Sequence, residues 1–102
     1  MAEFVRVAAV SEIAPGAFKA FTINRKAIVV CNSGDGIYAV DDVCTHDGAP
    51  IHTGRLFGHI IMCPRHGAKF DVRDGSVQAP PAVIPLEKYE VKIENDEIYV
   101  RV

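Results

Sequence analysis

Two short segments of the sequence each combine one cysteine with one histidine. The first is Cys44-Thr-His46, and sixteen residues separate its histidine from the second, Cys63-Pro-Arg-His66. Two thiolates and two imidazoles form a full ligand set for one soft or borderline metal centre. A glycine follows each histidine within two residues. Because glycine adopts positive φ at little cost, both segments are expected to be tight loops that turn backbone N–H groups toward a charged centre.

The distribution of ligand types between the two segments separates two kinds of metal site. A Cys2His2 zinc site usually takes two cysteines from one loop and two histidines from another element. Here each segment supplies one of each. That favours a binuclear [2Fe–2S] cluster in which one iron takes both cysteines and the other takes both histidines. The pattern therefore predicts one [2Fe–2S] cluster, with zinc and a chance grouping of these residues as the alternatives.

With this ligand pattern the chain resembles the Rieske proteins, and the resemblance covers nearly its whole length. It implies that Cys44 and Cys63 hold a buried iron, while His46 and His66 hold an outer iron near the surface. It also implies the all-β Rieske fold, with a proline-containing loop that covers the cluster. The segment Ala79-Pro-Pro-Ala82 lies at the corresponding place.

Two departures from the family pattern indicate a branch of it. The Rieske proteins of respiratory and photosynthetic cytochrome complexes have one more cysteine in each loop, joined as a disulfide, and Ala49 and Arg65 stand at those places here. Those proteins also use a serine and a tyrosine to donate hydrogen bonds to the cluster sulfurs, whereas Ala68 and Phe70 cannot donate. Fewer donors stabilise the reduced cluster less and lower its potential. The chain thus resembles the soluble Rieske-type ferredoxins of aromatic-ring-hydroxylating dioxygenase systems.

That resemblance implies a function and two partners. The chain is expected to carry single electrons from an NAD(P)H-dependent, flavin-containing ferredoxin reductase to a terminal oxygenase, without catalysing a reaction itself. One alternative with the same fold is the small subunit of assimilatory nitrite reductase, a family that often lacks some of the ligands. The other alternative is a zinc-stabilised interaction module.

Length and composition limit the remaining possibilities. The 102 residues suffice for one domain, and a hydrophobic content of 49% supports a small core. A net charge of −2 and a pI near 6.0 give no indication of a nucleic-acid or membrane surface. Glu3 and Arg6 interrupt the apolar N-terminal run, so neither a signal peptide nor a membrane anchor is expected. We expect a monomer in the reducing cytoplasm, where the cysteines stay unpaired.

The arrangement of apolar residues predicts the fold class. Proline and glycine punctuate short β-type segments, and no stretch keeps a helical period over three turns. Two small stacked antiparallel sheets are expected, with residues 49–57 mostly irregular. Each ligand loop is expected to top a hairpin, within a cluster-binding subdomain over about residues 42–72 of a single domain, 1–102. The expected strands are 3–9, 17–23, 27–31, 37–40, 59–62, 68–71, 86–94 and 97–102.

Other residues whose side chains could take part in chemistry have simpler interpretations. Asp47, His52 and His59 could be imagined as the facial triad of a mononuclear iron site, but so small a domain has little interior left for a substrate pocket. Both histidines are expected to be solvated. Cys31 ends a run of apolar residues and is expected to pack as a small hydrophobe.

Charged residues flank both ligand loops. Asp41, Asp42 and Asp47 lie around the first, and Arg65 and Lys69 around the second. Most are expected to be solvated charges that maintain solubility. Those beside the histidines are candidates for steering an electron-transfer partner, because such encounters are small and transient.

Overall fold

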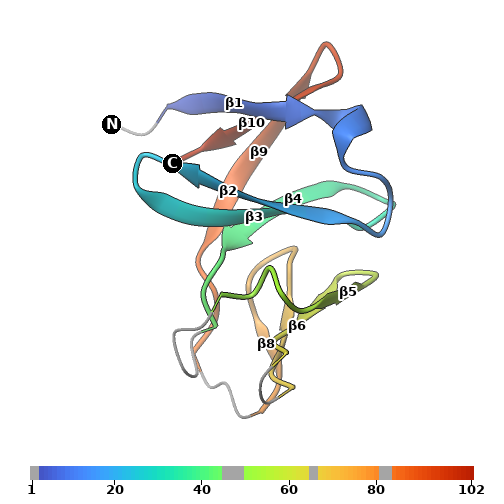
Figure 1. Cartoon of the computed structure of the whole chain (residues 1–102), viewed down its shortest axis with the longest axis vertical. Coiled ribbons are helices and arrows are strands. Elements are labelled where there is room, and N and C mark those ends of the chain that lie inside the picture. The colour runs from blue at the N-terminus through green and yellow to red at the C-terminus, as the bar shows by residue number, and fades with distance from the viewer. Residues whose placement is uncertain (1–2, 45–49, 65–66, 81–83) are drawn as a thin grey trace.

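The computed structural model describes residues 3–44, 50–64, 67–80 and 84–102, and these form two antiparallel sheets (Figure 1). Across the larger sheet the strand order is β1 (Phe4–Ala9), β10 (Glu97–Arg101), β9 (Lys88–Glu94), β4 (Ile37–Asp41), β3 (Lys26–Asn32) and β2 (Phe18–Ile23). Across the smaller it is β5 (Arg55–Phe57), β6 (Ile60–Met62), β7 (Lys69–Asp71) and β8 (Val77–Ala79). One 3-10 turn, η1 (Val10–Glu12), follows β1. The predicted all-β fold is confirmed.

Two-residue turns close two hairpins of the six-stranded sheet. Asn24 and Arg25 between β2 and β3, and Asn95 and Asp96 between β9 and β10, all have φ between 50° and 68°. Positive φ at both central residues is the turn geometry that matches the twist of paired strands, and Asn and Asp tolerate it better than most residues. The predicted strands 86–94 and 97–102 therefore form a hairpin around Asn95-Asp96.

The interior strand β3, which lies between β4 and β2, is buried on both faces over most of its length. Its side chains alternate between two cores: Ile28 and Val30 enter one enclosed by the six-stranded sheet, while Val29 and Cys31 enter a second one between the two sheets. Burial on both faces explains the unbroken apolar run in the sequence. We call the second cluster the inter-sheet core; it comprises Val29, Cys31, Val40, Cys44, Ile51, Ile61, Cys63, Ala68, Phe70, Val72 and Leu86.

Two expectations about the strands need correction, and one further strand was not predicted, although the eight predicted strands are present with ends within two residues. Residues 55–57, expected to be irregular, form β5, and residues 77–79 form β8; both lie at edges of the four-stranded sheet. A strand of three residues is too short to display an alternating pattern. The first ligand loop does not top a hairpin, because it connects β4 of one sheet with β5 of the other. Only the second loop, between the paired strands β6 and β7, does so.

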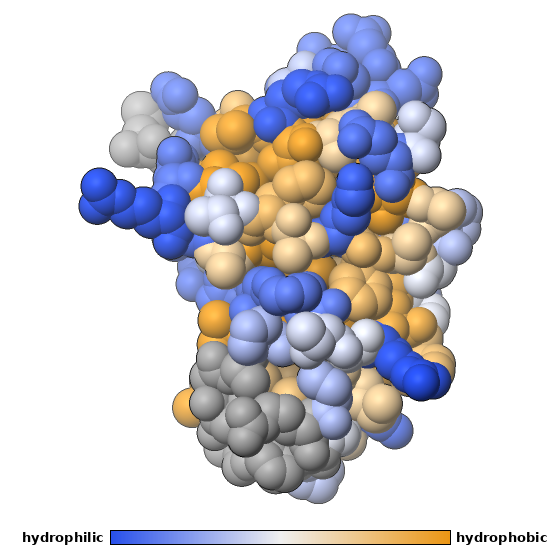
Figure 2. Space-filling view, viewed as in Figure 1, coloured by the Kyte–Doolittle hydropathy of each residue, from blue (hydrophilic) through white to orange (hydrophobic). Residues whose placement is uncertain are grey.

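The surface combines apolar and hydrophilic areas. Apolar side chains gather over β2 and β3 in the middle of the molecule, and hydrophilic side chains border them (Figure 2). Within the described ranges no helix has the length and apolar character needed to cross a membrane.

Candidate metal centre

The two predicted cysteine ligands reach the same place from different sheets. Cys44 lies three residues after the end of β4, and Cys63 directly follows β6. Both side chains have an exposed fraction of 0% and both belong to the inter-sheet core. The fold thus places both predicted ligands in one buried core at the junction of the sheets, the arrangement that an iron bound by two cysteines requires.

Backbone hydrogen bonds close the second ligand loop tightly. The amide of Cys63 donates to the carbonyl of Ala68 at 2.7 Å, and the amide of Gly67 donates to the carbonyl of Cys63 at 3.2 Å. Gly67 has φ of 75°, a region that glycine occupies without a steric penalty. The positive φ expected after the second histidine is therefore confirmed. His66 itself, like His46 of the first loop, lies outside the described residues.

A buried carboxylate closes the first ligand loop. Asp42 is 6% exposed, and its Oδ1 accepts hydrogen bonds from the amides of Ile51 at 2.8 Å and His52 at 2.7 Å. Its Oδ2 lies 2.6 Å from Nδ1 of His52. Asp42 therefore joins the two ends of the loop that begins with Cys44. The prediction of Asp42 as a flanking surface charge was therefore wrong, and no local sequence pattern pairs it with a residue ten positions away. The prediction of His52 as solvated is confirmed, because its side chain is 43% exposed even though Nδ1 contacts Asp42.

A second contact holds the end of β4 to β9. The hydroxyl of Tyr89 donates to Oδ1 of Asp41, and the amide of Asp41 donates to the carbonyl of Glu87 at 2.9 Å. Burial of the ring and the hydrogen bond to Asp41 raise the pKa of Tyr89 well above its usual range. Asp41 and Asp42 are thus both used in internal contacts.

Cys31 shares the inter-sheet core with the two predicted ligands. Burial, and secondarily the charge of Asp42, raises the pKa of its thiol to about 12. A thiol with so high a pKa is protonated and unreactive at neutral pH. Cys31 therefore packs as a small hydrophobe, as predicted.

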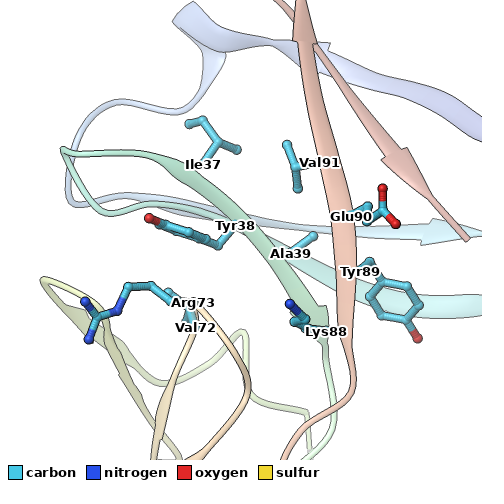
Figure 3. Close-up of a pocket in the computed structure, with 9 residues that line it drawn as sticks. All are labelled: Ile37, Tyr38, Ala39, Val72, Arg73, Lys88, Tyr89, Glu90 and Val91. Atoms are coloured by element: carbon cyan, nitrogen blue, oxygen red, sulfur yellow. The ribbon is translucent and has the colours of Figure 1, made fainter.

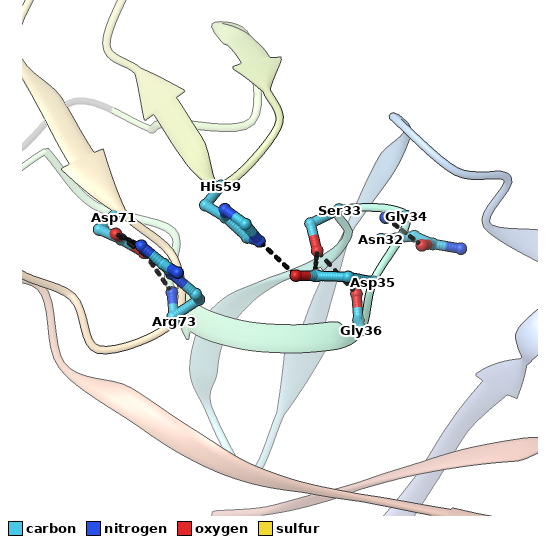
Figure 4. Close-up of polar contacts among 8 residues, drawn as sticks. All are labelled: Asn32, Ser33, Gly34, Asp35, Gly36, His59, Asp71 and Arg73. Carbon is cyan, nitrogen blue, oxygen red and sulfur yellow. Dashed lines mark hydrogen bonds and ion pairs between the residues drawn. The ribbon is translucent and has the colours of Figure 1, made fainter.

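The remaining described histidine, His59, links the two sheets at the end of β6 away from Cys63 (Figure 4). Its Nε2 lies 2.8 Å from Oδ2 of Asp35 in the β3–β4 loop. Its backbone carbonyl accepts a hydrogen bond from the amide of Val72 at 2.8 Å. The Tyr38 ring meets it edge-on, with ring centroids 6.3 Å apart. His52 and His59 thus pair with different carboxylates, and Asp47 lies outside the described residues.

We expect His59 and Asp35 to stabilise the fold cooperatively. Hydrogen bonds from the Ser33 hydroxyl and from His59 lower the pKa of Asp35. A carboxylate whose pKa is lowered on folding contributes fully to stability when the pH is above the pKa of the unfolded state, about 3.9 for aspartate. That contribution is lost as the pH falls through the lower pKa that the carboxylate has in the folded state. Thermal unfolding of D35A, H59A and D35A/H59A should therefore show favourable coupling at pH 7 that shrinks toward about pH 3.

Asp74 provides the matched control for this cycle. It is another exposed aspartate whose pKa is lowered by a serine, Ser76, and its hydrogen bonds do not involve His59. The losses of stability caused by D74A and by H59A should simply add in the double variant. Equal coupling in both cycles would mean that the His59–Asp35 contact adds nothing specific.

A surface hollow of about 240 Å³ lies where the β7–β8 turn meets β4 and β9 (Figure 3). Its lining includes Tyr38, Val72, Arg73 and Lys88, and neither described cysteine ligand contributes to it. Ligand pockets usually occupy about 300–1,000 Å³. The hollow is smaller than that and separate from the candidate metal centre.

Comparison with known proteins agrees with this geometry. A family profile described as the Rieske [2Fe-2S] domain matches residues 3–90. Ferredoxin CarAc of Metapseudomonas resinovorans is 35% identical over 98 residues, which are 95% of this chain and 92% of the relative. The ferredoxin component of biphenyl 2,3-dioxygenase from Rhodococcus jostii (strain RHA1) is 35% identical over 95 residues, with 93% and 89% covered.

Solved structures show the same likeness over the whole fold. The ferredoxin of carbazole 1,9a-dioxygenase from Nocardioides aromaticivorans IC177 superposes with a TM-score of 0.91 at 35% identity, covering 95% of each chain. A second match, with a TM-score of 0.90 and 35% identity, comes from a complex of reduced oxygenase and oxidized ferredoxin in carbazole 1,9a-dioxygenase, covering 95% of this chain and 91% of that one.

The described residues fit the group that this family binds. Two buried thiols and a hydrogen-bonded glycine loop supply the sulfur side of a Rieske ligand set. The sequence supplies one histidine in each of the same two loops. The chain belongs to the Rieske [2Fe-2S] domain family, and its cofactor is a Rieske-type [2Fe-2S] cluster.

Proposed function

We propose that this protein carries single electrons from an NAD(P)H-dependent flavin reductase to the terminal oxygenase of an aromatic-ring-hydroxylating dioxygenase system, and that it catalyses no reaction alone. The observation that carries the proposal is the placement of Cys44 and Cys63 in one buried core. Relatives that are ferredoxin components of dioxygenase systems, one of them in complex with an oxygenase, support the choice of partners.

We assign the four cluster ligands as predicted. Cys44 and Cys63 hold one iron, and His46 and His66 hold the other, within a cluster-binding subdomain over about residues 42–72 of one domain, 1–102. When bound, the cluster takes up and releases one electron. The chain's own residues keep water from the sulfur ligands: Ile61 and Phe70, both 0% exposed, lie in the same core as the two cysteines.

We further propose a cytoplasmic monomer that binds neither membranes nor nucleic acid. The net charge of −2 and pI near 6.0 offer no general attraction to anionic polymers or lipid surfaces. An electron carrier that must leave one partner to reach the next also benefits from small, short-lived contacts.

The test combines spectroscopy with electron transfer. The purified protein should be red-brown and, after reduction, give a rhombic EPR spectrum that His46→Ala or His66→Ala abolishes or alters. It should also mediate electron flow from NADH through a flavin reductase to a ring-hydroxylating oxygenase. A colourless zinc protein would refute cluster binding. A coloured protein that transfers electrons only within a nitrite reductase would favour that alternative.

The reduction potential should lie in the negative part of the Rieske range of roughly −150 to +300 mV. Ala68 and Phe70 are both fully buried beside the second ligand loop, and neither side chain donates a hydrogen bond. Ala68→Ser or Phe70→Tyr should therefore raise the midpoint potential by adding a donor to a cluster sulfur. Voltammetry of the three proteins measures this. Phe70→Leu, which changes the packing without adding a donor, is the control and should not raise the potential.

A further inference from the structure

The outer face of the four-stranded sheet can be defined from its register. Leu56, Ile61 and Phe70 are register partners across β5, β6 and β7, and all three contact the inter-sheet core. Successive side chains of a strand point to opposite faces. The residues before and after these three in each strand therefore point outward, away from the inter-sheet core.

This outward face has an apolar end beside the β5–β6 turn and two cations at the other end, next to the second ligand loop. Phe57 is 53% exposed and pairs with the partly exposed Ile60; Met62, also partly exposed, pairs with Arg55 and Lys69, which are both exposed. Arg55 and Lys69 form no ion pair with another described residue. We call these five residues the outer face. Met62 and Lys69 flank the second ligand loop directly, so the outer face borders the candidate metal centre.

The charge of the chain is distributed unevenly between the two sheets. Residues 55–79, which form the four-stranded sheet, contain four Lys or Arg and two Asp, a net charge of +2. The other residues contain seven Lys or Arg and eleven Asp or Glu, a net charge of −4. Asp71, the one carboxylate that points outward from this sheet's described strands, is 6% exposed and bound by Arg73 at 2.7 Å, which lowers its pKa (Figure 4). The outer face is therefore cationic on a chain that is acidic overall.

We propose that the outer face docks on an acidic, partly apolar surface of the terminal oxygenase. This inference rests on the function proposed above. An uneven charge distribution orients an approaching protein before contact, so it turns the cluster-bearing sheet toward an acidic partner. The exposed Phe57 supplies an aromatic anchor at the β5–β6 turn end of the contact, where Ile60 pairs with it, and Met62 lies two residues further along β6.

The test measures delivery of electrons to an oxygenase of stated identity. The holoprotein, reduced with dithionite, is mixed in a stopped-flow instrument with the terminal oxygenase of carbazole 1,9a-dioxygenase from Nocardioides aromaticivorans. The wild-type rate constant should fall with rising ionic strength. R55E/K69E should lower it at low salt by on the order of tenfold, and F57S by about threefold. Cluster content should stay unchanged in these variants. Reversing two charges beside the cluster in R55E/K69E lowers the midpoint potential, which increases the driving force toward the oxygenase, so slower transfer by this variant reports weaker docking.

Matched substitutions on the six-stranded sheet are the controls. K19E/R25E makes the same change of net charge at two exposed residues, and I93S removes an apolar side chain that is 47% exposed. Both controls should transfer electrons like the wild type. Equal rates in outer-face and control variants would overturn the docking surface while the proposed function stands. A wild-type protein that transfers nothing would overturn the function and the inference with it. Variants that slow only reduction by a flavin reductase would assign the face to the reductase, which contradicts the proposal.

Discussion

The Cys63→Ser protein is expected to lack its cluster and to be largely unfolded at 25 °C, and Cys44→Ser should behave alike. Each cysteine follows a strand of a different sheet, so a cluster held by both connects the two sheets through the centre of the inter-sheet core. Losing a bound metal group removes its contribution to folding, which is comparable with the total stability of a small domain, about 5–15 kcal/mol. Iron and sulfide analysis, with far-UV circular dichroism, measures both effects.

Cys31→Ala is the matched control for the cysteine variants. Cys31 is equally buried in the same core, but it lies within β3 and is not a predicted ligand. Its replacement should cost about 1–2 kcal/mol of stability and leave the cluster in place. If Cys31→Ala lost the cluster and Cys63→Ser kept it, the ligand assignment would be wrong.

The Gly54→Ala protein should be strongly destabilised and should hold its cluster poorly. A Cβ atom on Gly54 would lie 1.9 Å from the carbonyl oxygen of Met62 and 3.1 Å from that of Ile51. The backbone of β6 must then move, and Cys63 is the next residue after Met62. Such overpacking against backbone should cost about 3 kcal/mol or more. For a domain of this size that corresponds to a melting temperature lower by about 12 °C or more.

Gly58→Ala distinguishes this close approach from a general effect of removing glycine. Gly58 has φ of 58° in the β5–β6 turn, and a Cβ atom added there would have nothing within 4 Å. Its replacement should cost only the strain of an alanine in the left-handed conformation, about 1–2 kcal/mol of stability. Cluster content should stay unchanged. A Gly54→Ala protein that melted like Gly58→Ala would show that β6 yields easily at Met62.

Much of the candidate site could be predicted from the sequence because its chemistry is local. The spacing of Cys44, His46, Cys63 and His66 indicates a Rieske ligand set without reference to any distant residue. The turn at Asn95-Asp96 was predictable for the same reason, since residues that tolerate positive φ define that hairpin by themselves. The buried strand β3 was predictable from its own run of apolar residues.

The tertiary structure alone decided how the ligand loops are held. Asp42 lies ten residues from His52, and Asp35 lies 24 residues from His59, so neither contact has a local sequence signal. β5 has three residues and becomes a strand because Leu56 packs on the inter-sheet core beside β6. That placement carries the first ligand loop from one sheet to the other. Side-chain burial across the sheets, which no short stretch of sequence encodes, therefore determines the frame in which the two cysteines meet.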